Sequence, residues 1–271
     1  MNQAIGVIDS GVGGLTVANE LMRQLPKEQL IYVGDTLRCP YGPRTELEIR
    51  MFTWNMVNFL LDKQIKMLVI ACNTATAFTL SELHEKLDIP VIGVIQPGAR
   101  AAINATKNNR VGIIGTEGTI KSKAYSMALN TIKEDIQSTS LACPSFVPLV
   151  ENGILEGREA YKTVEKGLQP INNKELMLDT LILGCTHYPL LRGIIQEILG
   201  DDIEIISSSE ETARETSTIL EMNDLLNKEE STLTHHVYTT GELNNFKHLM
   251  NNVFKRYLKN IKNMEIKKAV L

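Results

Sequence analysis

Short aliphatic runs alternate with segments of helical periodicity along most of this chain. Between the first two runs, Leu15, Ala18, Met22 and Leu25 recur at helical spacing, and Pro26 ends the helix. This alternation is typical of a mostly parallel sheet with helices on both faces, so we expect an α/β fold. The aliphatic runs, each predicted to be a strand, lie at residues 4–8, 30–33, 67–71, 91–95, 111–114, 181–183 and 203–206.

Two of the predicted strand ends have almost the same sequence. Residues 67–75 are MLVIACNTA, and residues 181–189 are LILGCTHYP. In each, an aliphatic run ends in a small residue and a cysteine, and polar residues then open a helix. A second pair, residues 5–11 and 111–116, repeats a strand-and-turn pattern at a similar separation. We therefore expect two similar α/β domains related by pseudo-twofold symmetry, with the active site in the cleft between them.

Two polar segments are suitable places for the chain to cross between such domains. Gln96-Pro97-Gly98 has the composition of an interdomain turn, and Ser207-Ser208-Ser209 provides a second crossing. We expect a discontinuous first domain made of residues 1–97 and 208–271, and a second domain made of residues 98–207. The chain from about Asn244 onward is amphipathic and predicts a solvated terminal helix.

The four cysteines do not all have the same expected role. Free cysteine is usually a small buried hydrophobe, and that interpretation suffices for Cys39 and Cys143. Cys72 and Cys185 differ because each follows a predicted strand, at the sheet edge where ligands collect in α/β folds. The first N–H groups of the following helix would face each thiol, so we expect a lowered thiol pKa. Two such thiols predict a pair that faces one small substrate.

Composition narrows the class of partner. A chain of 271 residues can bury a full core without disulfides, and no cysteine pair has CxxC spacing. We expect a reduced, cytoplasmic protein, because the sequence shows no signal peptide and no long apolar span for a membrane. A formal charge of −4 and a single Trp argue against a nucleic-acid surface. A small molecule is the expected partner.

The loop after the first strand, Asp9-Ser10-Gly11-Val12-Gly13-Gly14, favours an anion over a dinucleotide. Its glycines let backbone N–H groups approach an anionic ligand. It lacks the GxGxxG spacing, however, and the Asp9 carboxylate would repel a pyrophosphate. The turn at Tyr41 and Gly42 follows the second strand and suits either a ligand-binding or a structural role.

His187 lies two residues after Cys185, at the predicted start of a helix. From there it can hydrogen-bond a ligand, stabilise the Cys185 thiolate or receive its proton. We expect no metal, because no other cysteine or histidine cluster would complete four zinc ligands around Cys185 and His187.

Five segments together resemble the bacterial glutamate racemases of the aspartate/glutamate racemase family. The resemblance extends from Ile5 to about Gly241 and is most specific at the two cysteine motifs. One departure is Ser207-Ser208-Ser209, where the family commonly has Asp-Ser-Gly. The segments are Asp9-Ser-Gly-Val-Gly-Gly14, Gly34-Asp-Thr with Arg38-Cys-Pro-Tyr-Gly42, Ala71-Cys-Asn-Thr-Ala75, Val147-Pro-Leu-Val-Glu151 and Gly184-Cys-Thr-His-Tyr-Pro189.

The resemblance implies cofactor-independent interconversion of L-glutamate and D-glutamate, with D-glutamate destined for peptidoglycan, by a homodimer. Cys72 would deprotonate D-glutamate and Cys185 would deprotonate L-glutamate, with Asp9 beside Cys72 and His187 beside Cys185 as further catalytic groups. An exchange of proton donor and acceptor roles between two thiols fits this chemistry. The implied substrate-binding residues are Asp9, Ser10, Tyr41, Gly42, Asn73, Thr74, Thr186 and His187.

Three other functions remain open from the sequence. An aspartate racemase, or another amino-acid racemase of the same family, would share the two thiols and differ in the side-chain pocket. A thiol hydrolase or transferase would use one cysteine as nucleophile and tolerate loss of the other. A two-lobed binding protein would close on an amino acid and need neither thiol.

Overall fold

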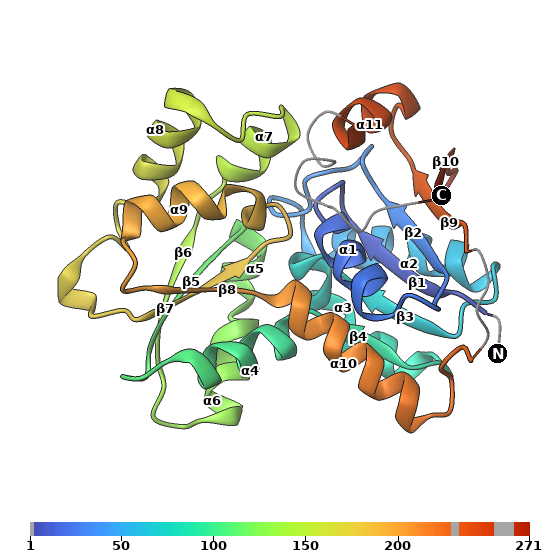
Figure 1. The fold of residues 1–271 in the computed structure, drawn as a ribbon, viewed down its shortest axis with the longest axis horizontal. Helices are drawn as coiled ribbons and strands as arrows, with labels where there is room; N and C mark the ends of the chain where they lie inside the picture. Colours follow the sequence, from blue (N-terminus) through green and yellow to red (C-terminus); the bar gives the residue numbers. More distant parts are fainter. Residues whose placement is uncertain (1–2, 229–232, 252–262) are drawn as a thin grey trace.

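The computed structural model describes residues 3–228, 233–251 and 263–271, and it contains two parallel sheets (Figure 1). The first sheet has strand order β10-β9-β2-β1-β3-β4, and the second has the order β6-β5-β7-β8. All pairings between these strands are parallel. The prediction of an α/β fold with two similar units is therefore confirmed. The strands are β1 (Ile5–Asp9), β2 (Leu30–Gly34), β3 (Met67–Ile70), β4 (Val91–Gly93), β5 (Arg110–Gly115), β6 (Gln137–Ala142), β7 (Thr180–Gly184), β8 (Glu204–Ser207), β9 (His235–Thr239) and β10 (Met264–Lys268).

Both sheets share one topology. In each, the first strand in sequence lies between the second and the third, and the fourth lies outside the third. Asp9 at the end of β1 thus corresponds to Gly115 at the end of β5. Likewise, Cys72 follows β3 and Cys185 follows β7. The repeated sequence pattern therefore marks equivalent positions in two copies of one arrangement.

Helices cover both faces of each sheet. In the first half, α1, α10 and α11 share a core cluster on one face, while α2 and α3 pack on the other. In the second half, α4 and α6 cover one face and α7 to α9 the other. The core that contains α1 continues into the helices α7 to α9, so the two halves share buried apolar surface. The helices are α1 (Leu15–Gln24), α2 (Glu46–Leu61), α3 (Asn73–Lys86), α4 (Ile95–Ala105), α5 (Glu117–Ser122), α6 (Ala124–Ile132), α7 (Phe146–Glu151), α8 (Gly157–Leu168), α9 (Arg192–Leu199), α10 (Ser208–Met222) and α11 (Leu243–Leu249), with 3-10 turns η1 (Lys174–Leu176) and η2 (Tyr188–Leu191).

The seven aliphatic runs all correspond to strands, whereas β6, β9 and β10 lie outside these runs. β6 has the sequence QSTSLA and is partly exposed along its length. It is an edge strand that pairs only with β5 among the described strands, so it needs no continuous apolar face. Hydrophobic patterning therefore misses it.

Two predictions about crossings and ends are wrong. Gln96-Pro97-Gly98 is not a turn but lies in the first turns of α4. Pro97 is the third residue of this helix, where a missing N–H costs nothing because the first N–H groups of a helix have no intrahelical partner. The predicted terminal helix starts where α11 starts, but it does not continue to the end of the chain, because β10 pairs there with β9. Residues 252–262 lie outside the described residues.

The strand membership of the two sheets supports a proposed division of the chain. Strands of the first sheet come from residues 5–93 and 235–268, and strands of the second from residues 110–207. We propose the division at 97/98 and 207/208, with residues 1–97 and 208–271 in the first domain and 98–207 in the second. α4 and α10, which follow the two crossings, pack against each other. None of the described helices has both the length and the apolarity for a membrane crossing.

Candidate active site

Loops at the carboxyl ends of strands from both sheets enclose a small cavity. The cavity is nearly closed in this structure, with a water-accessible volume of about 10 Å³. Nine of the ten predicted site residues line it, and Asp9 lies behind them. The lining residues are Ser10, Pro40, Tyr41, Gly42, Cys72, Asn73, Thr74, Thr116, Val147, Cys185, Thr186 and His187.

Cys72 caps the amino end of α3 and is buried. The backbone N–H of Ala75 donates to Sγ at 3.4 Å, and Sγ lies 3.6 Å from Oγ of Ser10. Burial nevertheless raises the pKa of the Cys72 thiol to about 12, and the Asp9 carboxylate adds to this rise. The predicted lowering of the Cys72 pKa is therefore wrong. Loss of hydration of the thiolate outweighs the two hydrogen bonds and the helix terminus.

Cys185 begins a chain of polar contacts that ends at a partly exposed carboxylate. Its Sγ lies 3.8 Å from Nδ1 of His187, and Nε2 of His187 lies 2.6 Å from Oε1 of Glu151. Burial lowers the pKa of His187, but hydrogen bonds to Cys185 and Glu151 more than offset this, so its pKa is raised well above 6.5. Burial raises the pKa of Glu151, yet the bonds to His187 hold that pKa below 4.5. The geometry favours an imidazolium paired with a carboxylate.

Asp9 joins the first half of the molecule to the second cysteine motif. It is fully buried, and its Oδ1 accepts a hydrogen bond from the N–H of Gly11 at 3.0 Å. Its Oδ2 accepts from the Thr186 hydroxyl at 3.2 Å. Burial raises the pKa of Asp9, and the nearby His187 partly offsets this rise. Asp9 therefore acts electrostatically on both cysteine motifs.

Asn73 carries a donor that is ready for a ligand. Its Oδ1 accepts a hydrogen bond from the Tyr125 hydroxyl at 2.7 Å. Its Nδ2 is buried and has no hydrogen-bond partner among the described residues. A buried donor without a partner costs about 1–3 kcal/mol, and Asn73 lines the cavity, so a ligand acceptor would relieve this cost. Next to it, the Thr74 hydroxyl lies 2.8 Å from that of Thr116.

Tyr41 contributes to the site through its loop rather than its hydroxyl. The hydroxyl donates to Oδ2 of the buried Asp35 at 2.6 Å, and Nε of Arg38 lies 2.6 Å from the same atom. Gly42 follows, and its carbonyl accepts from the N–H of Gly118 at 2.9 Å in the second half. A Cβ on Gly42 would lie 2.7 Å from Cβ of Thr116, so only glycine allows this approach.

One group of possible metal ligands lies at the edge of the cavity. Ligand atoms of Cys39, Glu151 and His187 are within 4.8 Å of one another. These residue types can bind zinc, but Glu151 and His187 already satisfy each other by a hydrogen bond.

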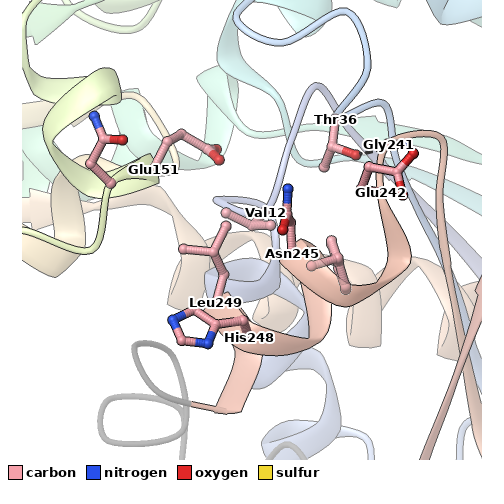
Figure 2. Close-up of a pocket in the computed structure, with 10 residues that line it drawn as sticks. Val12, Thr36, Glu151, Gly241, Glu242, Asn245, His248 and Leu249 are labelled. Carbon is pink, nitrogen blue, oxygen red and sulfur yellow. Dashed lines mark hydrogen bonds between the residues drawn. The ribbon is translucent and has the colours of Figure 1, made fainter.

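A second, more open pocket lies on the far side of Glu151, between α7 and α11. Figure 2 shows the Glu151 carboxylate from α7 directed toward the open space beside Val12 and Asn245. The Glu151 side chain is 25% exposed, whereas that of His187 is 2% exposed. Glu151 is therefore the member of the Cys185–His187–Glu151 chain that solvent reaches.

The sequence profile of the Asp/Glu/Hydantoin racemase family matches residues 5–216. The chain belongs to this family. It is 65% identical over 256 residues to a glutamate racemase of Oceanobacillus iheyensis, covering 94% of this chain and 93% of the relative. It is 54% identical over 268 residues to a glutamate racemase of Bacillus cereus, covering 99% of each.

Solved structures of family members share the whole fold. A glutamate racemase isoform from Bacillus anthracis superposes with a TM-score of 0.93 at 47% identity, covering 99% of this chain and 98% of that one. A Francisella tularensis glutamate racemase in complex with D-glutamate gives 0.88 at 33% identity, covering 100% and 97%. An aspartate racemase homologue from Pyrococcus horikoshii gives only 0.53 at 16% identity, a likeness of fold alone.

Sequence reasoning assigned no site role to five residues that the structure brings to the site, which are Pro40, Thr116, Tyr125, Val147 and Glu151. Val147 and Glu151 belong to a segment that carried the family resemblance, and Thr116 ends the repeated strand of the second half. Tyr125 had no signal, because a tyrosine on a helix is ordinarily a core residue.

Proposed function

We propose that this protein interconverts L-glutamate and D-glutamate without a cofactor, by proton transfer between two thiols. The observation that carries the proposal is that Cys72 and Cys185, from two different sheets, line one small cavity. Relatives at 54–65% identity over nearly the whole chain are named glutamate racemases, which favours glutamate as the substrate.

In the proposed reaction the Cys72 thiolate removes the α-proton of D-glutamate. The Cα–H bond breaks, and its electron pair stays on the α-carbon next to the α-carboxylate. The Cys185 thiol then donates its proton to the opposite face, which gives L-glutamate and a Cys185 thiolate. In the reverse direction Cys185 is the base and Cys72 the acid. The assignment of Cys72 to D-glutamate and of Cys185 to L-glutamate follows the family resemblance.

The carbanion-like transition state requires stabilisation, because an α-proton is weakly acidic and a thiolate is a modest base. We assign this role to hydrogen-bond donors around the cavity. The Asn73 amide is the clearest of them, since its Nδ2 is a buried donor that has no acceptor among the described residues. Ser10, Thr74, Thr186 and the backbone at Tyr41 and Gly42 complete the set that would bind the two carboxylates.

His187 and Glu151 would serve Cys185. An imidazolium 3.8 Å from Sγ stabilises the thiolate, and Glu151 keeps the imidazole charged. Because Glu151 reaches the open pocket, the same chain offers a path by which the buried Cys185 exchanges protons with solvent. Asp9 raises the pKa of Cys72, so we assign it to keeping Cys72 basic once ionised.

The wider setting is also part of the proposal. A supply of D-glutamate for peptidoglycan, a cytoplasmic location and a homodimer all follow from the family resemblance.

Incubation with one enantiomer of glutamate in deuterated water, without added metal or cofactor, tests the proposed function. Inversion of optical activity, with deuterium gained at the α-carbon, is the expected result. Neither inversion nor exchange with glutamate would overturn it, and aspartate and other amino acids would then be the next substrates. Inversion of aspartate but not glutamate would favour the aspartate racemase alternative.

A further inference from the structure

We propose that Tyr125 is a positioning residue that orients the Asn73 amide toward the substrate. Tyr125 lies on α6 in the second half of the molecule, whereas Asn73 begins α3 in the first half. This inference rests on the proposed function, because it concerns how that cavity recognises glutamate.

The Tyr125 hydroxyl makes two hydrogen bonds of opposite direction. The Ser208 hydroxyl hydrogen-bonds the Tyr125 oxygen, which lowers the Tyr125 pKa, although burial raises that pKa overall. The Tyr125 phenol donates its proton to Oδ1 of Asn73 at 2.7 Å, because an amide oxygen can only accept. Ser208 is therefore the donor in its own bond to the phenol oxygen.

The bond from Tyr125 fixes the orientation of the Asn73 amide. An asparagine side chain has an acceptor at one end and donors at the other, and a half-turn exchanges them. With Oδ1 held by Tyr125, Nδ2 remains as the atom without a partner in the described part of the chain. A substrate with two carboxylates needs donors, and the reversed amide would present an oxygen to it. The Tyr125 hydroxyl therefore selects the amide orientation that binds glutamate.

Tyr125 also lies close to the residues next to both thiols. Asn73 directly follows Cys72, and Gly184 directly precedes Cys185. A Cβ on Gly184 would lie 3.1 Å from Cε2 of the Tyr125 ring, so the strand before Cys185 packs closely on this ring. Tyr125 thus touches the neighbours of both cysteines.

Tyr125 also lies beside both crossings between the two halves. Ser208 starts α10 directly after the second crossing, and Gly98 lies near the start of α4 after the first. A Cβ on Gly98 would lie 3.2 Å from Oη of Tyr125 and 3.1 Å from Cβ of Ser208. The hydrogen-bonded residues Ser208, Tyr125 and Asn73 therefore lie where both crossings meet. The orientation of Asn73 thus depends on the relative placement of the two halves.

The test is a double-mutant cycle between Tyr125→Phe and Asn73→Ala, with kcat and KM measured in both directions. Tyr125→Phe removes only the hydroxyl, so we expect kcat/KM to fall about tenfold, the equivalent of one hydrogen bond. The fall should be equal in both directions, because the enantiomers are equally stable. In the Asn73→Ala background the same substitution should change kcat/KM by less than about twofold.

Tyr188→Phe is the matched control. Tyr188 is equally buried, and its hydroxyl donates to the Cys143 carbonyl at 2.8 Å rather than to Asn73. Its effect on kcat/KM, whatever its size, should be the same with and without Asn73. Thermal melting of each variant separates a loss of stability from a change in substrate recognition.

Ser208→Ala is a second, milder variant that removes the donor to the phenol oxygen. It should lower kcat/KM in the same direction as Tyr125→Phe and lose its effect in the Asn73→Ala background. Effects of Tyr125→Phe and Asn73→Ala that simply multiply would overturn the proposal and leave Tyr125 as a core residue. Wild-type protein in the same assay separates the two proposals. If it fails to racemise glutamate, the proposed function is refuted. The coupling between Tyr125 and Asn73 is then measured from the thermal shift that D-glutamate produces in each variant.

Discussion

Nε2 of His187 lies 2.6 Å from Oε1 of Glu151, so the histidine of the second cysteine motif is held by a carboxylate from α7. The residues are far apart in sequence, yet together they connect buried Cys185 to the exterior. The pair raises the pKa of His187 and lowers that of Glu151. Each partner therefore stabilises the charged form of the other.

Glu151→Gln should lower both activity and stability, in a pH-dependent way. The raised His187 pKa contributes stability that is fully present below 6.5 and is lost as pH rises through the folded value. The lowered Glu151 pKa contributes stability present above 4.5 and lost as pH falls through its folded value. The difference in melting temperature between wild type and variant should be largest between pH 4.5 and pH 6.5. A difference that does not vary with pH would contradict the ion pair.

Cys72→Ser and Cys185→Ser should each reduce kcat for racemisation by at least about 100-fold, because serine of similar size is a far weaker base. Circular dichroism should show an unchanged fold. Cys143→Ala is the matched control, since Cys143 is also buried but does not line the cavity. Near-full activity in either serine variant would rule out the two-thiol reaction.

The rate of Cys72 alkylation by iodoacetamide can be measured in the Cys185→Ser variant by peptide mass spectrometry. This rate should rise with pH between about pH 7 and pH 10 without levelling off. The reason is the burial that raises the thiol pKa to about 12. Asp9→Asn should shift the profile to lower pH, because the Asp9 charge contributes to that rise. A plateau near neutral pH in the Cys185→Ser protein that keeps Asp9 would show that the helix terminus prevails over burial.

Gly14→Ala should destabilise the protein and impair activity, since a Cβ there would lie 2.4 Å from Cβ of Asp9. We expect a loss of about 1–3 kcal/mol in the free energy of unfolding, as for an overpacked core. Gly193→Ala in α9 is the control, because nothing lies within 4 Å of its added Cβ. That variant should gain roughly 0.5–1 kcal/mol from lower chain entropy in the unfolded state. Urea unfolding measures both.

The main features of the fold and site could be predicted from local sequence. Aliphatic runs such as residues 67–71 form strands because a strand buried on both faces needs a continuous apolar stretch. The positions of Cys72 and Cys185 follow from the same rule, since a residue directly after a parallel strand lies at the ligand-binding edge of its sheet. The repeat of this pattern in both halves also predicted the shared topology seen in the two sheets.

Other features depended on contacts between distant segments. Edge strand β6 has no apolar pattern, and its strand conformation depends on backbone pairing with β5. The pKa of Cys72 depends on burial by both halves, which no helix-terminus rule includes. Glu151 and Tyr125 reach the site from α7 and α6.

The sequence alone determined the α/β class, the two thiols and their place at strand ends, because these depend on residues adjacent in the chain. Only the tertiary structure decided what surrounds each thiol: the burial of Cys72, the carboxylate behind His187 and the hydroxyl that holds Asn73. The physical reason is that pKa values and hydrogen bonds depend on distances through space between residues far apart in sequence.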